Sequence, residues 1–145
     1  MKGEKQIYAV IDTNVLVSSL LSSSKESNPA IVISSIINGG IIPLYNEEIL
    51  LEYKEVLTRK KFKFSLHTID VLISTFRIVG LNVNRTKVMK ESFPDPDDIV
   101  FYEVKMSVDD SYLVTGNIKH FPHSPLVVTP FQMVQILKDK GILAR

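Results

Sequence analysis

The chain has 145 residues, of which 45% are apolar and 23% charged; these proportions exclude a disordered chain and fit one globular domain over residues 1–145. Because the chain has no cysteine, disulfides, thiolate metal sites and cysteine nucleophiles are also excluded. The net charge of +1 excludes nucleic-acid binding through a strongly basic overall surface, so such binding would need a local basic patch or metal ions.

The apolar pattern predicts strands that alternate with helices. The β-branched run from Ile7 to Ile11 is typical of a strand that is covered on both faces. Further strands are expected at 40–44, 81–83, 111–115 and 126–128, and helices at 28–37, 46–59, 65–79, 95–106 and 129–138. The expected helix caps include Asn28, Asn46 and Thr129. Strands separated by helices are joined by right-handed crossovers, so this order predicts an α/β fold in which helices flank a parallel sheet.

Apolar runs also bear on where the protein resides. The first run is too short for a secretory signal, and no run of about 18 apolar residues could cross a membrane. We therefore expect a cytoplasmic protein with no membrane partner.

Two polar residues stand at predicted strand ends. Asp12 directly follows the first strand, and Asn117 follows the strand at 111–115. In open parallel sheets, ligands bind beyond the carboxyl ends of the strands, where the strand order reverses. Asp12 could instead cap a helix, because Asp12, Thr13 and Asn14 are all residue types that favour the N-cap.

Two further carboxylates are turned towards the core by the helical pattern. Glu52 lies one turn from Ile49, at the edge of an apolar stripe, and Asp98 shares a helix face with Phe101 and Tyr102. A carboxylate drawn towards a core needs a partner, which could be a basic side chain or a metal ion. The acids at the start of the later helix also suit the helix dipole. Several oxygens in one pocket would suit Mg²⁺ or Mn²⁺.

The order of these features along the chain resembles the PIN-domain family. The matching blocks are IDTNVLV at 11–17, NEEILLEY at 46–53, DPDD at 95–98 and YLVTGN at 112–117, followed by HF at 120–121 and TPF at 129–131. The resemblance implies a three-layer α/β/α fold with a roughly five-stranded parallel sheet. It also implies cleavage of single-stranded RNA by a divalent-metal-dependent endoribonuclease.

The resemblance assigns roles to individual residues. It implies that Asp12, Glu52 and Asp98 are catalytic and hold Mg²⁺ or Mn²⁺. Many PIN domains carry aspartate at position 117, where this chain has Asn117, which we expect to assist a second metal ion.

Supporting residues and partners complete this expectation. We expect Thr13, Asn14 and Thr115 to orient the carboxylates. The family often acts as the toxin of a VapBC-type toxin–antitoxin pair and commonly dimerises. The expected partners are therefore single-stranded RNA, a cognate antitoxin protein and a second copy of the chain.

One dense basic run is a candidate RNA contact. Arg59, Lys60 and Lys61, with Lys63 close by, could contact the RNA backbone, because phosphate contacts supply most non-specific affinity. The same residues could be the solvated end of a helix, where cations suit the dipole. No catalytic role is expected for the histidines, which are His67, His120 and His123.

Two alternative functions stay open from the sequence. An aspartyl-nucleophile phosphatase commonly needs a second aspartate two positions after Asp12, where this chain has Asn14. A PIN-like module that binds RNA or protein with little catalysis is favoured by Asn117, which brings no charge to the site.

Overall fold

The computed structural model describes residues 6–85, 93 and 95–145. In this part of the chain the strands are β1 (Ile7–Ile11), β2 (Ile41–Tyr45), β3 (Leu81–Asn82), β4 (Tyr112–Val114) and β5 (Val127–Val128). They form one sheet in the order β3-β2-β1-β4-β5, and every neighbouring pair is parallel. The predicted α/β fold with a five-stranded parallel sheet is confirmed.

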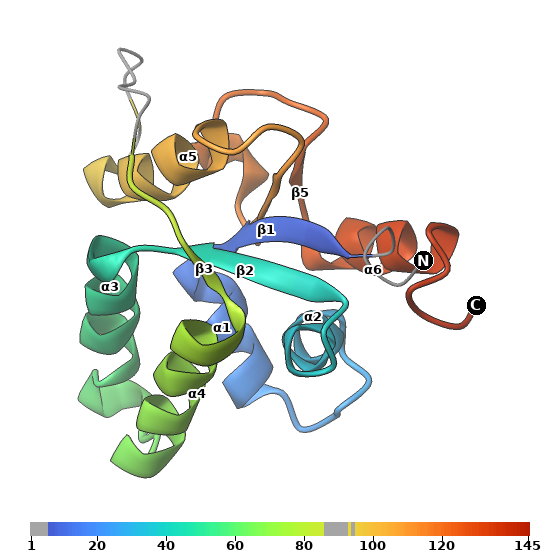
Figure 1. Cartoon of the computed structure of the whole chain (residues 1–145). Helices are drawn as coiled ribbons and strands as arrows, with labels where there is room; N and C mark the ends of the chain where they lie inside the picture. Colours follow the sequence, from blue (N-terminus) through green and yellow to red (C-terminus); the bar gives the residue numbers. More distant parts are fainter. Residues whose placement is uncertain (1–5, 86–92, 94) are drawn as a thin grey trace.

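Helices cover both faces of the sheet. They are α1 (Thr13–Leu21), α2 (Asn28–Ile37), α3 (Glu47–Leu57), α4 (Leu66–Val79), α5 (Ile99–Met106) and α6 (Pro130–Asp139). Figure 1 shows α1 to α4 on one side of the sheet and α5 on the other, and α6 packs against α2. Among the described residues, no helix has both the length and the apolar character needed to span a bilayer.

Local sequence sets where most helices begin. Asn46 and Thr129 cap α3 and α6 through their side chains, as predicted. The prediction for α2 is wrong by one residue, because Ser27 and not Asn28 is the cap and accepts a hydrogen bond from the backbone N–H of Ala30. The helix expected at 95–106 begins with a tight 3₁₀ turn at Pro96–Asp98 before α5.

Helix α1 was not among the predicted elements. It begins directly after Asp12, so this residue stands between the end of β1 and the first turn of a helix. The Asp12 side chain makes no capping hydrogen bond, however, and the capping role that the sequence left open is therefore not what this carboxylate does.

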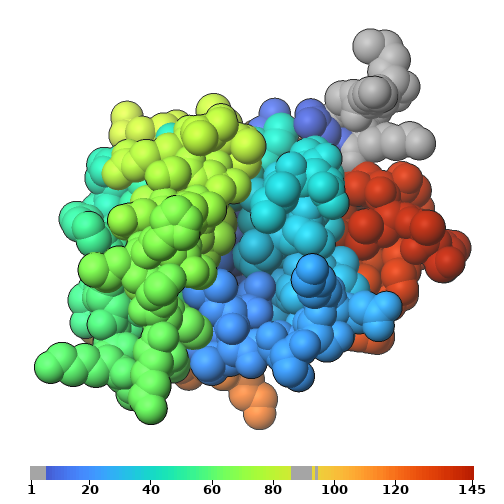
Figure 2. Space-filling model, turned by 90° about the horizontal axis from the view of Figure 1, so that it is seen from below, coloured from blue at the N-terminus to red at the C-terminus, as the bar shows by residue number. Residues whose placement is uncertain are grey.

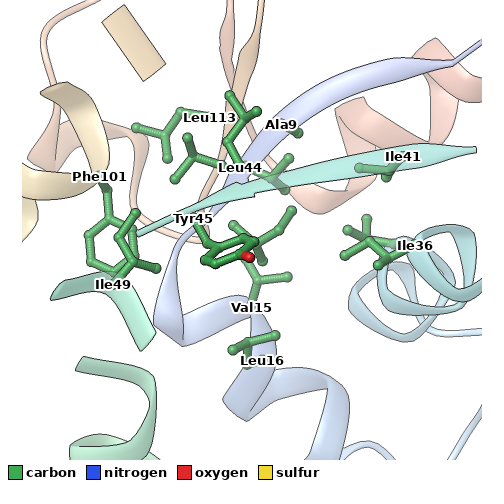
Figure 3. Packing of buried hydrophobic residues seen from close by; sticks show 14 of the residues in the cluster. Ala9, Val15, Leu16, Ile36, Ile41, Leu44, Tyr45, Ile49, Phe101 and Leu113 are labelled. Carbon is green, nitrogen blue, oxygen red and sulfur yellow. The ribbon is translucent and has the colours of Figure 1, made fainter. Parts of the chain in front are cut away.

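The core lies between the sheet and its helices. Figure 3 shows Ala9, Leu44 and Leu113 from neighbouring strands packing with helix residues such as Leu16 and Phe101.

Within the core, a layer of three aromatic rings joins three helices. Its rings are Tyr53 of α3, Phe76 of α4 (centroids 5.3 Å apart) and Phe101 of α5 (6.1 Å from Tyr53). This layer holds α3 against both α4 and α5.

The strand order defines where a site can form. From β1 the chain proceeds to β2 and β3 on one side, and it returns to the other side of β1 with β4 and β5. The order therefore reverses between β1 and β4, and the crevice beyond the carboxyl ends of these two strands is the expected ligand position. Asp12 follows β1 and Thr115 follows β4 at this point.

Candidate active site

Asp12 is held in place by side chains at the two strand ends. It is only 6% exposed. Thr115 Oγ1 donates a hydrogen bond to Asp12 Oδ2 over 2.7 Å, and Asn14 Nδ2 donates to the same oxygen over 3.2 Å. Burial raises the pKa of Asp12, and the Thr115 hydrogen bond opposes this rise because it stabilises the carboxylate. The second carboxylate oxygen, Oδ1, receives neither bond.

The same network continues into the segment after β4. Asn14 Oδ1 accepts a hydrogen bond from the backbone N–H of Gly116, and Thr115 Oγ1 accepts one from that of Asn117, both over 2.9 Å. The backbone of Asn117 is thus fixed relative to Asp12, while its side chain is exposed. The structure does not bring the Thr13 hydroxyl into the network, because this buried oxygen has no hydrogen-bond partner among the described residues.

Asp98 is the second buried carboxylate, and its charge lies close to that of Asp12. It is 9% exposed, and burial, followed by the charges of Asp12 and Asp95, raises its pKa from 3.8 to about 6. Its Oδ2 atom is shielded from solvent and has no hydrogen-bond partner in the described part of the chain. A buried carboxylate oxygen of this kind, beside a second carboxylate, suits a divalent cation as its missing partner.

His120 belongs to this group, although the sequence analysis gave it no role. Its Nδ1 atom lies 3.3 Å from Asp98 Oδ2, an ion-pair distance without hydrogen-bond geometry, and its charge lowers the pKa of both Asp98 and Asp12. The signal in the sequence was its position three residues after Asn117, within the block that follows β4.

Glu52 faces a different set of charges. The causes that raise its pKa are, in order, partial burial and the charges of Asp97, Glu55 and Asp95, while Arg59 lowers it. It opens into a cleft of about 300 Å³ between α3 and the start of α5. The cleft is lined by Glu48, Glu52, Arg85, Pro96, Asp97, Ile99 and Val100.

The predicted metal ligands therefore fall into two groups. Asp12 and Asp98 are both buried, and the charge of Asp12 raises the pKa of Asp98, whereas Glu52 lies with Asp97 in the cleft. Within residues 6–85, 93 and 95–145, no three histidine, aspartate or glutamate side chains are placed so that they could hold one metal ion between them.

Tyr53 connects the two groups. Its hydroxyl donates a hydrogen bond of 2.5 Å to the carbonyl oxygen of Ile11, the residue before Asp12, and it directly follows Glu52 in α3. Burial, and then the charge of Asp12, raises the pKa of Tyr53 well above its ordinary value, so the phenol keeps its proton and remains a donor. The sequence pattern identified Tyr53 only as part of an apolar stripe. Apolar periodicity shows which residues face the core, but it does not show which backbone group a buried hydroxyl will bind.

The predicted RNA-contacting residues lie at the far end of α3. Arg59, Lys60 and Lys61 are exposed, and Arg59 pairs with Glu55 over 2.9 Å. None of them lines the cleft beside Glu52.

Comparison with known proteins identifies the family. Residues 8–119 match the PIN domain, which is more than half of the chain, and the chain therefore belongs to the PIN-domain family. PIN domains are generally nucleases and typically use divalent metals, so the protein is, at the level of its class, a nuclease. Neither the curated proteins nor the solved structures contain a match to this chain.

Proposed function

We propose that the protein is a divalent-metal-dependent endoribonuclease that hydrolyses phosphodiester bonds in single-stranded RNA. The observation that carries the proposal is the buried Oδ2 of Asp98, which lies in the field of the buried Asp12 and has an ion-pair contact of 3.3 Å with His120 but no well-aligned hydrogen bond among the described residues. Two desolvated carboxylates at a strand-order reversal are stable together only when a cation or a proton compensates their charge.

The residues that would hold Mg²⁺ or Mn²⁺ are Asp12 and Asp98, with Glu52 and Asn117 at the margins of the site. When bound, the ion supplies positive charge that favours ionisation of a water and stabilises the leaving oxygen of the phosphodiester. Thr115 and Asn14 keep the Asp12 carboxylate oriented through their hydrogen bonds to Oδ2. His120 lies 3.3 Å from Asp98 and, when protonated, would offer a positive charge to a phosphate oxygen of the substrate.

The proposal includes a biological role as the toxin of a VapBC-type pair that acts in the cytoplasm as a homodimer. Its support is the resemblance of the sequence blocks to the PIN-domain family, which often acts as the toxin of such a pair. A small DNA-binding protein encoded by the neighbouring gene, and its co-purification with this chain, would test the role. A neighbour of unrelated function and a purified protein without a partner would exclude it.

The activity itself is tested with end-labelled single-stranded RNA. Cleavage is expected in Mn²⁺ and is expected to stop in excess chelator. It should also weaken in acid, because protons compete for the carboxylates. The Asp12→Asn variant, purified in the same way, controls for contaminating nucleases. A duplex RNA and a DNA strand of the same sequence define the substrate. Full cleavage in chelator would exclude the metal-dependent mechanism.

One second candidate has a specific observation in its favour. A PIN-like module that binds RNA or protein with little catalysis fits a site in which Glu52 faces Asp97 and position 117 carries no charge. Calorimetric titration with Mn²⁺ separates the two. Binding at Asp12 and Asp98 accompanied by cleavage supports the nuclease, and RNA binding with neither metal binding nor cleavage supports the module. The phosphatase alternative gains no support, because Asn14 is engaged as an amide with Asp12 and Gly116.

A further inference from the structure

A short segment between α3 and α4 combines aromatic rings with a concentration of positive charge. We call residues 59–64 (RKKFKF) the basic aromatic turn. It contains four of the chain's 17 basic residues, although the whole chain carries a net charge of only +1. Figure 2 shows this turn (green, lower left) at the outer edge of the molecule, on the opposite side from α6 (red).

The two phenylalanines of the turn have different environments. Phe62 and Phe64 stack on each other, with ring centroids 5.4 Å apart and planes inclined by 9°. Both rings are half-buried. Phe64 packs against the hydrophobic core, and Phe62 is not among the described residues that form or contact this core. Phe64 therefore joins the stack to the core, and Phe62 is its outer ring.

Positive charge lies directly beside the Phe62 ring. Lys61 Nζ lies over this ring, 5.1 Å from its centroid, in a cation–π arrangement. Lys60, Lys61 and Lys63 are exposed, and no ion pair involving them is found in the described part of the structure. Stacked rings beside unpaired cations are the combination by which proteins bind single-stranded nucleic acid without sequence preference.

The turn is connected to the candidate active site along one face of α3. Glu52, Glu55 and Arg59 are spaced three and four residues apart, so they follow one face of the helix to its end. Arg59 pairs with Glu55, and its charge lowers the pKa of Glu52. The basic aromatic turn thus begins within electrostatic reach of the cleft beside Glu52.

From these contacts we infer that the basic aromatic turn binds single-stranded RNA outside the active site. A base would stack on Phe62 in place of the Lys61 ammonium, and the freed Lys61 and the neighbouring lysines would contact phosphates. The identity of the ligand rests on the proposed function, since the same strand would continue from the cleft along α3. The stacking site itself does not require cleavage.

Binding is tested in the Asp12→Asn background, so that the RNA stays intact. The probe is a fluorescein-labelled oligouridine, and its affinity is measured by anisotropy at several salt concentrations. Phe62→Leu should weaken binding roughly 5- to 100-fold, the effect of losing one base–aromatic stack, with the salt dependence unchanged. Phe131→Leu, which alters an exposed phenylalanine on α6, is the matched control and should bind like the parent.

Replacing the lysines should instead change the salt dependence of binding. Replacing Lys60, Lys61 and Lys63 by glutamine should reduce the slope of log affinity against log salt by about 2, because each phosphate contact to a single strand contributes about 0.7. A duplex RNA of equal length offers no unstacked base, so Phe62→Leu should leave its affinity unchanged.

A second variant keeps the test decisive if Phe62→Leu disturbs folding. The chain has no tryptophan, so Phe62→Trp introduces a single fluorophore at the stacking position. Oligouridine should quench its emission in proportion to binding. Unquenched emission on saturation with RNA, or equal affinities of the parent and Phe62→Leu, would overturn the inference. If the wild type fails to cleave RNA while Phe62→Leu still weakens binding, the proposed nuclease fails and the stacking site stands.

Discussion

The two halves of the candidate active site are built in different ways. Around Asp12 the carboxylate is fixed by hydrogen bonds of 2.7 and 3.2 Å, and the residues that make them are bonded in turn to the segment after β4. Around Glu52 the carboxylate is half-buried in an open cleft, and the charges that act on it come mainly from other acids. Hydrogen bonds fix the carboxylate of Asp12, whereas the carboxylate of Glu52 is mainly repelled by neighbouring acids.

This difference indicates how the site can respond to a ligand. Hydrogen-bonded groups at the ends of two adjacent strands cannot move without breaking the bonds that join them. The acids around Glu52 repel one another, so a cation or a basic group in the cleft would change their arrangement at low cost. In the proposed ribonuclease, the half around Asp12 would define the position of the reacting phosphate, and the half around Glu52 would adapt to it.

The largest effect is expected from removing the charge at the centre of the fixed half. Asp12→Asn should reduce RNA cleavage in Mn²⁺ by more than about 100-fold, since residues that merely support metal ligands already contribute 10- to 100-fold. Without metal, its melting temperature should equal or exceed that of the wild type, because an amide avoids the cost of a buried charge. Asp70→Asn, which changes an exposed residue of α4, is the control. Unchanged cleavage by Asp12→Asn would exclude this site.

A smaller loss of activity should follow from removing hydrogen bonds around Asp12 while every carboxylate is kept. Thr115→Val keeps the shape of the side chain and removes the donor to Asp12 and the acceptor for Asn117, so metal affinity or activity should fall by about 10- to 100-fold. Thr115→Ser retains the hydroxyl and should stay near wild-type activity. Equal activities of the two variants would show that the hydrogen bonds do not position Asp12.

Adding a negative charge at the margin of the site should modestly strengthen metal binding, whereas the two preceding variants weaken it. Asn117→Asp is expected to lower the Mn²⁺ concentration for half-maximal cleavage by up to about tenfold, or about 1.4 kcal/mol, because a carboxylate attracts a divalent ion more strongly than an amide does. Titrations with and without a non-cleavable RNA measure it. Asn38→Asp, at the exposed end of α2, should change nothing. An unaltered metal dependence in Asn117→Asp would place Asn117 outside the ligand set.

The smallest effect concerns stability and pH in the absence of metal. The pKa of Asp98 is about 6 in the folded protein and near its ordinary value of 3.8 when unfolded, so the folded state binds the extra proton between these values. The free energy of unfolding should therefore rise as the pH falls from 7 to 5. The gain should be about 1 kcal/mol, since each pKa unit carries about 1.4 kcal/mol before solvent screening.

This pH effect is measured by urea unfolding in chelator. The groups that face Asp98 are Asp12, Asp95 and His120, so the Asp98→Asn variant is needed to isolate its contribution. In that variant the gain between pH 7 and pH 5 should shrink. An identical pH dependence of the two proteins would show that Asp98 is not the titrating group.

Much of the fold was predictable because its signals are local. The β-branched run at 7–11 became β1, and Asn46 and Thr129 cap helices as their side chains predict. The misses also have local causes. Helix α1 follows Asp12 without a side-chain cap. At the start of α2, two adjacent residues could both cap, and Ser27 does so.

The sequence by itself determined the order of the strands and of the helices other than α1, together with the position of Asp12 at a strand end, because apolar periodicity and capping depend on neighbours in the chain. Only the tertiary structure decided which charges meet. The 3₁₀ turn before α5 directs Asp98 to Asp12 and leaves Asp97 facing Glu52, and the segment after β4 brings His120 to Asp98. Tyr53 joins α3 to β1 across 42 positions of the chain. Contacts of this kind depend on how the helices pack across the end of the sheet, and this packing cannot be predicted from residue spacing in the sequence.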